Sequence, residues 1–326
     1  MPFYLNFWAL YENFEKEVII IEKNKSKIGS WFIVISSVLW GTALLYSQYI
    51  LDNGISSKDL VSLKMFFGFT TLLIYILIKD KSLLKINKRG IYYCIIIGFV
   101  CHALYNLFMF SAMERTTIST TVTLLYTSPI FVMIMSRIFF DEEITHNKLL
   151  ALVFCVVGCW LTVTGGSIKS MDLNFRGILY GLASGICYGT MTLLNKKISN
   201  DYDQITILTY TFGFAFMFSL IFSNPISIFY IPFNPLVYLF VIMLGVLSTS
   251  VSYLFYTKGL SYGVESSKAS IIATLEVPVS VIGSVIIFKQ RLSIIEVIGM
   301  LFVLTSVILL NEKFINNIKI FKTFDT

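Results

Sequence analysis

Ten long apolar runs, separated by short polar connections, make up most of the chain. A helix needs about 17–25 mainly apolar residues to cross the hydrocarbon core of a bilayer, and each run reaches that length. The runs are Ile28–Leu51, Leu60–Ile78, Ile91–Ala112, Thr117–Phe139, Leu149–Gly165, Gly177–Leu194, Ile205–Phe222, Leu236–Thr257, Ser267–Phe288 and Ile294–Leu310. The runs are continuous rather than alternating, so the pattern predicts an all-α membrane protein with ten transmembrane helices.

The composition excludes a soluble domain. Of the 326 residues, 56% are hydrophobic and only 13% are charged, whereas a soluble domain carries about a quarter charged residues. The five cysteines all lie in apolar runs without metal-ligand spacing, so we expect them to pack in the core and predict no metal or cofactor. The net charge of +6 is attributed to membrane orientation, and no nucleic-acid partner is expected.

The basic residues of the connections predict the orientation. Seventeen Lys and Arg residues fall on the side that holds both ends of the chain, and six fall on the other. Because cytoplasmic loops are enriched in Lys and Arg, both termini are predicted to be cytoplasmic in a multi-pass protein of the cell membrane. Residues 1–27 mix acids with lysines and do not resemble a signal peptide. They are interpreted as a cytoplasmic or interfacial extension, and residues 312–326 as a cytoplasmic tail.

The two halves of the chain resemble each other at an offset of about 148 residues. Trp40-Gly41-Thr42 matches Tyr188-Gly189-Thr190, and Pro129 matches Pro278. This predicts two five-helix repeats, residues 28–165 and 177–311. Five is an odd number, so the second repeat must be inverted in the membrane. Inverted repeats are typical of alternating-access transporters, which bind their substrate between the repeats near the bilayer midplane.

Small residues recur on one face of the sixth predicted helix. Gly177, Gly181, Gly185 and Gly189 are spaced by four, which lets a neighbouring backbone approach closely in lipid. Together with Pro129 and Pro278, these glycines are assigned to helix packing. The glycine face could pack within a monomer or form a homodimer contact.

Two ionisable residues lie inside predicted spans, where a charge is costly unless it is paired or wetted. Glu276 is in the middle of the ninth helix, and Lys64 lies about one turn inside the second. We interpret both as candidates for a functional site. Lys64 could instead extend to the membrane surface, and Glu276 could pair with Lys64 or Lys268.

A polar face on the third helix completes the candidate pathway. His102, Tyr105 and Asn106 are spaced so that they share that face, and the repeat predicts a matching face on the eighth helix. These side chains could line a pathway or merely form hydrogen bonds between helices. The predicted substrate pathway consists of Trp40, Lys64, His102, Tyr105, Asn106, Tyr126, Tyr188, Thr249, Tyr253 and Glu276.

Several short motifs together resemble the EamA-type ten-helix members of the drug/metabolite transporter superfamily. They are Trp40-Gly41, Tyr126-Thr127-Ser128-Pro129, Phe140-Asp141-Glu142-Glu143-Ile144-Thr145, Pro278 and Gln290-Arg291-Leu292-Ser293. The chain departs from the family at Lys64, where an arginine is usual, and at Gln290, where a glutamate is usual. The resemblance implies transport of a small metabolite such as an amino acid or an amine. The acidic cluster Asp141-Glu142-Glu143 is interpreted as a surface turn or helix cap.

The sequence therefore favours a secondary transporter with a small-molecule substrate, driven by a coupling proton or sodium ion or by exchange. It has only two histidines, His102 and His146, and neither has a catalytic or metal-binding partner at the required spacing. A membrane enzyme, a channel and a receptor without alternating access are the alternative functions.

Overall fold

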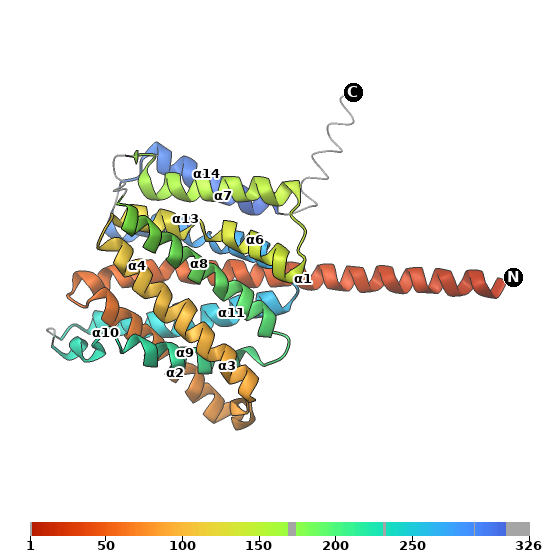
Figure 1. Cartoon of the computed structure of the whole chain (residues 1–326), viewed down its shortest axis with the longest axis horizontal. Helices are drawn as coiled ribbons and strands as arrows, with labels where there is room; N and C mark the ends of the chain where they lie inside the picture. Colours follow the sequence, from red (N-terminus) through yellow and green to blue (C-terminus); the bar gives the residue numbers. More distant parts are fainter. Residues whose placement is uncertain (1, 169–173, 231–232, 290, 311–326) are drawn as a thin grey trace.

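The computed structural model describes the backbone of residues 2–168, 174–230, 233–289 and 291–310, and the side chains from residue 24 onward within those ranges. Every regular element in these ranges is helical (Figure 1). The α-helices are α1 (Pro2–Asp52), α2 (Ser57–Lys79), α3 (Lys88–Ile96), α4 (Tyr105–Met113), α5 (Ile118–Leu125), α6 (Ser128–Phe140), α7 (His146–Thr164), α8 (Phe175–Ile198), α9 (Gln204–Ser219), α10 (Pro235–Gly245), α11 (Ser252–Ser261), α12 (Ser266–Ala273), α13 (Glu276–Phe288) and α14 (Ile294–Leu309).

Eight helical spans in the described residues are long and apolar enough to cross a bilayer, and each coincides with a predicted run. The other two runs form α9 and α14, which are apolar but only 16 residues long. At 1.5 Å per residue, such a helix extends about 24 Å, less than the roughly 30 Å of a typical hydrocarbon core. The all-helical prediction is confirmed, and length supports eight of the ten predicted spans.

The first helix is longer than its predicted span. Its backbone continues without interruption through residue 27, so the predicted extension and the first span form one helix, α1. Its amino-terminal part projects well beyond the other helices in Figure 1.

Two of the predicted helices are interrupted at equivalent places. The fourth run divides into α5 and α6 at residues 126–127, and the ninth divides into α12 and α13 at residues 274–275. The cause is a proline in each second half, Pro129 in α6 and Pro278 in α13. A proline has no N–H to donate, and its ring clashes with the carbonyl four residues earlier. The sequence analysis placed both prolines correctly but treated each run as a single helix.

Other local features also recur at the repeat offset. A π-helical stretch, Ile97–Leu104, joins α3 to α4, and a second one, Val246–Val251, joins α10 to α11. Asp141 and Lys289 end α6 and α13 in the left-handed conformation, with φ of 52° and 54°. The two halves of the chain are thus repeated in backbone geometry as well as in sequence.

The first helix of each repeat packs against helices of the other repeat. Helix α1 packs against α11 and α13 of the second repeat, and α8 packs against α4, α5 and α6 of the first. Equivalent helices also meet each other, because α2 contacts α9 and α7 contacts α14. Figure 1 shows the α7–α14 pair along one edge of the bundle. Each repeat therefore completes the packing of the other.

The glycine face of α8 lies against helices of the same chain. A Cβ atom built on Gly181 would lie 2.6 Å from a methyl carbon of Leu124, and one on Gly185 would lie 3.1 Å from the Leu124 carbonyl oxygen. Gly177 and Gly189 contact Thr116 and the region of Ser128 in the same way. These glycines bring α8 close to the interrupted helix pair α5–α6.

A buried ionic cluster joins the two repeats at one end of the bundle. The Glu142 carboxylate accepts hydrogen bonds from the backbone N–H groups of Ser266 (2.6 Å) and Ser267 (3.1 Å), at the start of α12. Its oxygens also lie 2.9 Å from Lys196 Nζ, at the end of α8, and 2.6 Å from the Ser267 hydroxyl. We call Glu142, Lys196, Ser266 and Ser267 the Glu142 clamp. The interpretation of Glu142 as a cap is consistent with this geometry, but its side chain is 7% exposed rather than on the surface.

Substituting Gly185 with leucine should destabilise the protein. The new side chain would meet the backbone of Leu124 and Leu125, which cannot move aside as a flexible side chain could. We expect a melting temperature in detergent lower by several degrees and a reduced yield. Ala183→Leu is the matched control, because Ala183 shares the outward face of α8 with the exposed Leu179 and Ile186. An unchanged melting temperature for Gly185→Leu would show that this face does not support close packing.

The Glu142 clamp should make stability depend on acid pH. Burial raises the pKa of Glu142, but the Ser267 and Lys196 hydrogen bonds and the Lys196 charge together outweigh it and lower the pKa to about 2 from 4.5. Because the folded-state pKa is depressed, the stabilisation is complete above about pH 4.5 and disappears as the pH falls toward 2. Glu142→Gln should reduce the free energy of unfolding by about 2–3 kcal/mol at pH 7.

Thermal unfolding of Glu142→Gln and wild type between about pH 3 and about pH 7 measures this effect. The gap in melting temperature should narrow toward pH 3. Glu143→Gln is the control, since Glu143 is the adjacent, exposed acid. Equal destabilisation by both variants would contradict the assigned role of the clamp.

Candidate functional site

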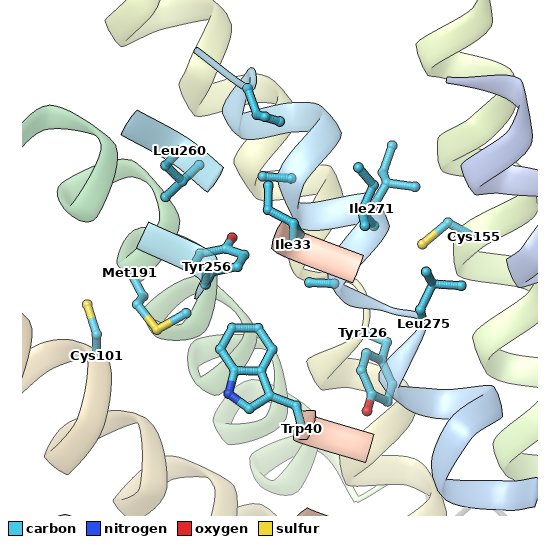
Figure 2. Packing of buried hydrophobic residues seen from close by; sticks show 14 of the residues in the cluster. Ile33, Trp40, Cys101, Tyr126, Cys155, Met191, Tyr256, Leu260, Ile271 and Leu275 are labelled. Carbon is cyan, nitrogen blue, oxygen red and sulfur yellow. The ribbon is translucent and has the colours of Figure 1, made fainter. Parts of the chain in front are cut away.

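Trp40 lies at the centre of a group of aromatic side chains where the two repeats meet. Its ring centroid is 5.0 Å from that of Tyr253 and 5.0 Å from that of Tyr256, both on α11. Trp40 is 7% exposed and Tyr256 is 1% exposed. Figure 2 shows Trp40 turned toward Tyr256, with Tyr126 on its other side. Trp40 of the first repeat thus packs against α11 of the second repeat.

The aromatic group continues from Tyr253 to the π-helical stretch Ile97–Leu104 and to α9. The His102 ring lies 5.4 Å from Tyr253 and 5.7 Å from Phe212 on α9. His102 belongs to the π-helical stretch Ile97–Leu104, and such stretches often occur at functional sites. Its Nε2 atom is buried and has no hydrogen-bond partner in the described part of the chain. The stretch Ile97–Leu104 therefore meets α11 through the His102 and Tyr253 side chains.

A second ring pair lies on the neighbouring helices. Tyr105 on α4 and Tyr188 on α8 have their ring centroids 5.7 Å apart. Both side chains interact electrostatically with the Glu276 carboxyl group, so they lie beside the same acid. Both residues are half-buried among the packed helices.

Glu276 is located at the interruption of the ninth helix. It is the first residue of α13, and its carbonyl oxygen would lie 2.9 Å from a Cβ atom built on Gly41, next to Trp40. The Tyr126 side chain, at the interruption of the fourth helix, interacts with the Glu276 carboxyl group. The two helix interruptions therefore place an acid and a phenol against each other.

Lys64 is the basic counterpart of Glu276 in this region. The two charges interact electrostatically, yet they form no ion pair, so their charged atoms are more than 4.0 Å apart. Lys268, the other cation considered for Glu276, forms an ion pair with Glu265 at 2.7 Å. Both residues are half-buried among the helices.

Two of the predicted pathway residues, Thr249 and Asn106, use their polar side-chain groups in hydrogen bonds to nearby backbone carbonyls. The Thr249 hydroxyl donates to the Leu244 carbonyl at 2.9 Å, and its methyl group would contact a Cβ atom on Gly68. Asn106 is 1% exposed and donates its amide to the His102 carbonyl at 2.5 Å. Both side chains serve helix geometry and packing where the structure describes them.

The sequence did not assign two neighbours of the site, Phe212 and Thr192, and it placed a third, Tyr256, only on the polar face of the eighth predicted helix. Phe212 contacts both His102 and Tyr253, and the Tyr256 hydroxyl lies 2.7 Å from the Thr192 hydroxyl, where either can donate. The repeat gave a partial signal for Phe212, since Phe67-Gly68-Phe69 matches Phe212-Gly213-Phe214. Nothing in the sequence paired Thr192 with Tyr256, which are 64 residues apart.

Four of the five cysteines belong to the same buried cluster as Trp40 and Tyr126. All five are free and buried, and Cys155 makes a 3.4 Å contact with the Thr274 hydroxyl beside the helix interruption. Across the described residues, no three His, Cys, Asp or Glu side chains are grouped closely enough to hold a metal ion. The site offers one acid, one base and several aromatic faces, which are groups that bind a small solute.

Comparison with known proteins agrees with the duplicated architecture. The model of the EamA-like transporter family matches the chain twice, at residues 27–164 and 175–312. An "uncharacterized transporter" of Archaeoglobus fulgidus is 26% identical over 288 residues, covering 87% of this chain and 96% of its own. The "uncharacterized inner membrane transporter YicL" of Salmonella typhimurium is 22% identical, covering 87% and 95%.

Structural comparison supports the same fold. A crystal structure superimposes with a TM-score of 0.70 at 14% identity, covering 87% of this chain and 96% of the other. The two family matches begin 148 residues apart, the offset found from the sequence motifs. The chain is therefore a member of the EamA-like transporter family, with the family domain present twice.

Proposed function

We propose that this protein is a secondary transporter that moves a small metabolite, such as an amino acid or an amine, across the cytoplasmic membrane by alternating access. The observation that carries the proposal is the pair of interrupted helices, which bring Tyr126 and Glu276 together beside Trp40. Transporters with inverted repeats bind substrate where discontinuous helices meet between the repeats.

The proposed topology has ten spans, with both termini in the cytoplasm. It includes the short helices α9 and α14, because each packs against its equivalent in the other repeat, α2 and α7. Short spans are accommodated by local thinning of the bilayer at modest cost. If either short helix did not cross the membrane, the two repeats would no longer have five spans each, and their equivalent helices would not run in opposite directions through the membrane.

In the proposed transport cycle, the Glu142 clamp holds one end of the helix bundle closed. In the proposed topology the clamp lies on the cytoplasmic side, and it ties the α6–α7 connection to α8 and α12. The equivalent position in the second repeat is Gln290, and the equivalent of Lys196 is Gln48. The charges of Glu142 and Lys196 are therefore not repeated at the equivalent sequence positions of the other half.

The alternative functions lack comparable support. A membrane hydrolase needs a nucleophile with a base or a metal, and within the described ranges no three His, Cys, Asp or Glu side chains are grouped closely enough to hold a metal ion. A channel would be built around a repeated selectivity ring, whereas here one acid, Glu276, and one base, Lys64, interact electrostatically.

Replacing the central acid by its amide tests the proposal. The purified protein is reconstituted into liposomes and offered a defined mixture of amino acids, amines, organic acids and sugars, with uptake followed by mass spectrometry. Wild type should accumulate at least one component, and Glu276→Gln should reduce that uptake at least tenfold while keeping its melting temperature, because only the charge is lost. If a proton is the coupling ion, the pH dependence of uptake should flatten in the variant.

Glu143→Gln makes the same chemical change at an exposed position and is the control. Loss of stability in Glu276→Gln, with uptake reduced only in proportion, would assign the acid to a structural pair with Lys64. Wild-type uptake with wild-type stability would remove Glu276 from the site. Absence of any uptake by the wild type would contradict the proposed function.

A further inference from the structure

We infer that the connection between α9 and α10 binds the headgroup region of the bilayer through the rings of Phe229, Tyr230 and Phe233. The partner is the boundary between phospholipid headgroups and acyl chains, where aromatic side chains are enriched in membrane proteins. Figure 1 shows the start of α10 at the end of the bundle opposite to the projecting part of α1. The inference goes beyond the proposed transport activity and does not depend on it.

The connection is unusually poor in charge. Residues 220–234 join the two helices, and none of them is Asp, Glu, Lys or Arg. The connection between α2 and α3, residues 80–87, is about half as long and contains one acid and two lysines. A connection that runs through water is normally polar. The composition of residues 220–234 is therefore suited to contact with lipid.

Large apolar side chains of this connection are exposed although they lie outside the α-helical spans. Among its described residues, Phe229 is 72% exposed, Tyr230 and Phe233 are both 78% exposed, and Ile226 is 56% exposed. An exposed apolar patch of this kind marks a site of interaction with a protein or a membrane. We call these four side chains the aromatic loop surface.

Hydrogen bonds to the bundle hold the aromatic loop surface in place. The buried Asp59 carboxylate on α2 accepts hydrogen bonds from the Asn224 backbone N–H (2.5 Å) and the Ser227 hydroxyl (2.8 Å). The Tyr238 hydroxyl on α10 donates to the Ile228 carbonyl at 3.2 Å. Polar groups of the connection are thus satisfied by the bundle, while its rings remain on the outside.

The length of α9 sets the depth of the connection in the membrane. In the proposed ten-span topology α9 crosses the bilayer, but its 16 residues extend only about 24 Å, against roughly 30 Å of hydrocarbon. The residues that follow α9 therefore lie at the level of the membrane interface. Other aromatic side chains gather at this end of the bundle, since the Tyr49 and Phe240 rings are 5.0 Å apart and the Phe233 and Tyr238 rings 5.3 Å apart. This favours the bilayer interface over a protein partner.

Spin labels in lipid nanodiscs test the inference. Phe229→Cys, Tyr230→Cys and Phe233→Cys are each labelled in full-length protein whose five native cysteines have been replaced. Oxygen partitions into lipid, whereas a nickel chelate stays in water. We expect the ratio of oxygen to nickel collisions at the three rings to exceed that at Glu114→Cys several-fold. Glu114 is the control, because it is exposed and lies at the same end of the bundle, 3.8 Å from Lys58.

Two results would overturn the inference. A collision ratio at the three rings equal to that at Glu114→Cys would mean that the aromatic loop surface faces water. Low access to both reagents would mean that a second copy of the chain, or another protein, covers it. The melting temperature of each labelled variant should match that of its parent, because the replaced side chains are exposed.

Photocrosslinking of the unmodified protein provides a measurement that needs no substitution. One phosphatidylcholine carries a diazirine next to the glycerol, and another carries it at the end of the acyl chain. The first lipid should label the peptide that contains Phe229 several-fold more than the second does. Equal labelling by both lipids, or labelling confined to other peptides, would contradict binding at the headgroup boundary. Neither result affects the proposed transport, which is tested separately by uptake into liposomes.

Discussion

The loss of backbone hydrogen bonds at two equivalent prolines is the constraint on which the rest of the structure depends. In a bilayer, every backbone carbonyl must find a partner or border on water. Pro129 and Pro278 interrupt the fourth and ninth helices, and the opposite repeat covers the interrupted backbone. Ser37 on α1 donates to the Ile272 carbonyl at 3.1 Å. At the equivalent position on α8, Gly185 packs directly onto the Leu124 carbonyl.

This exchange explains why the polar groups gather in one place. The same interruptions that need cover also place Tyr126 and Glu276 at the ends of their helix segments. Because α1 and α8 each pack against the interrupted helix of the other repeat, Trp40 and Tyr188 are carried to the same region. Packing, backbone satisfaction and the candidate site are consequences of one pseudo-symmetric arrangement.

Much of this arrangement could be predicted from the sequence, because it depends on periodic or repeated signals. Hydrophobic run length predicted the spans, and the offset of Trp40 and Pro129 from their equivalents predicted the repeats. The clamp could not be found that way, since Glu142 bonds to residues 54 and 124 positions away. Thr249 was assigned to the pathway by analogy with His102, but its hydroxyl bonds within its own helix. Face assignments by analogy do not tell which polar groups are already satisfied.

The central claim is that the two faces open in alternation, and pulsed electron paramagnetic resonance distances in lipid nanodiscs test it most directly. One pair of spin labels at Glu143 and Asp201 reports the face of the Glu142 clamp, and a second pair at Asp52 and Arg291 reports the opposite face. All four side chains are exposed. In a Glu142→Gln background, the first distance should lengthen while the second shortens. Distances that stay fixed, or that lengthen together, would contradict alternating access.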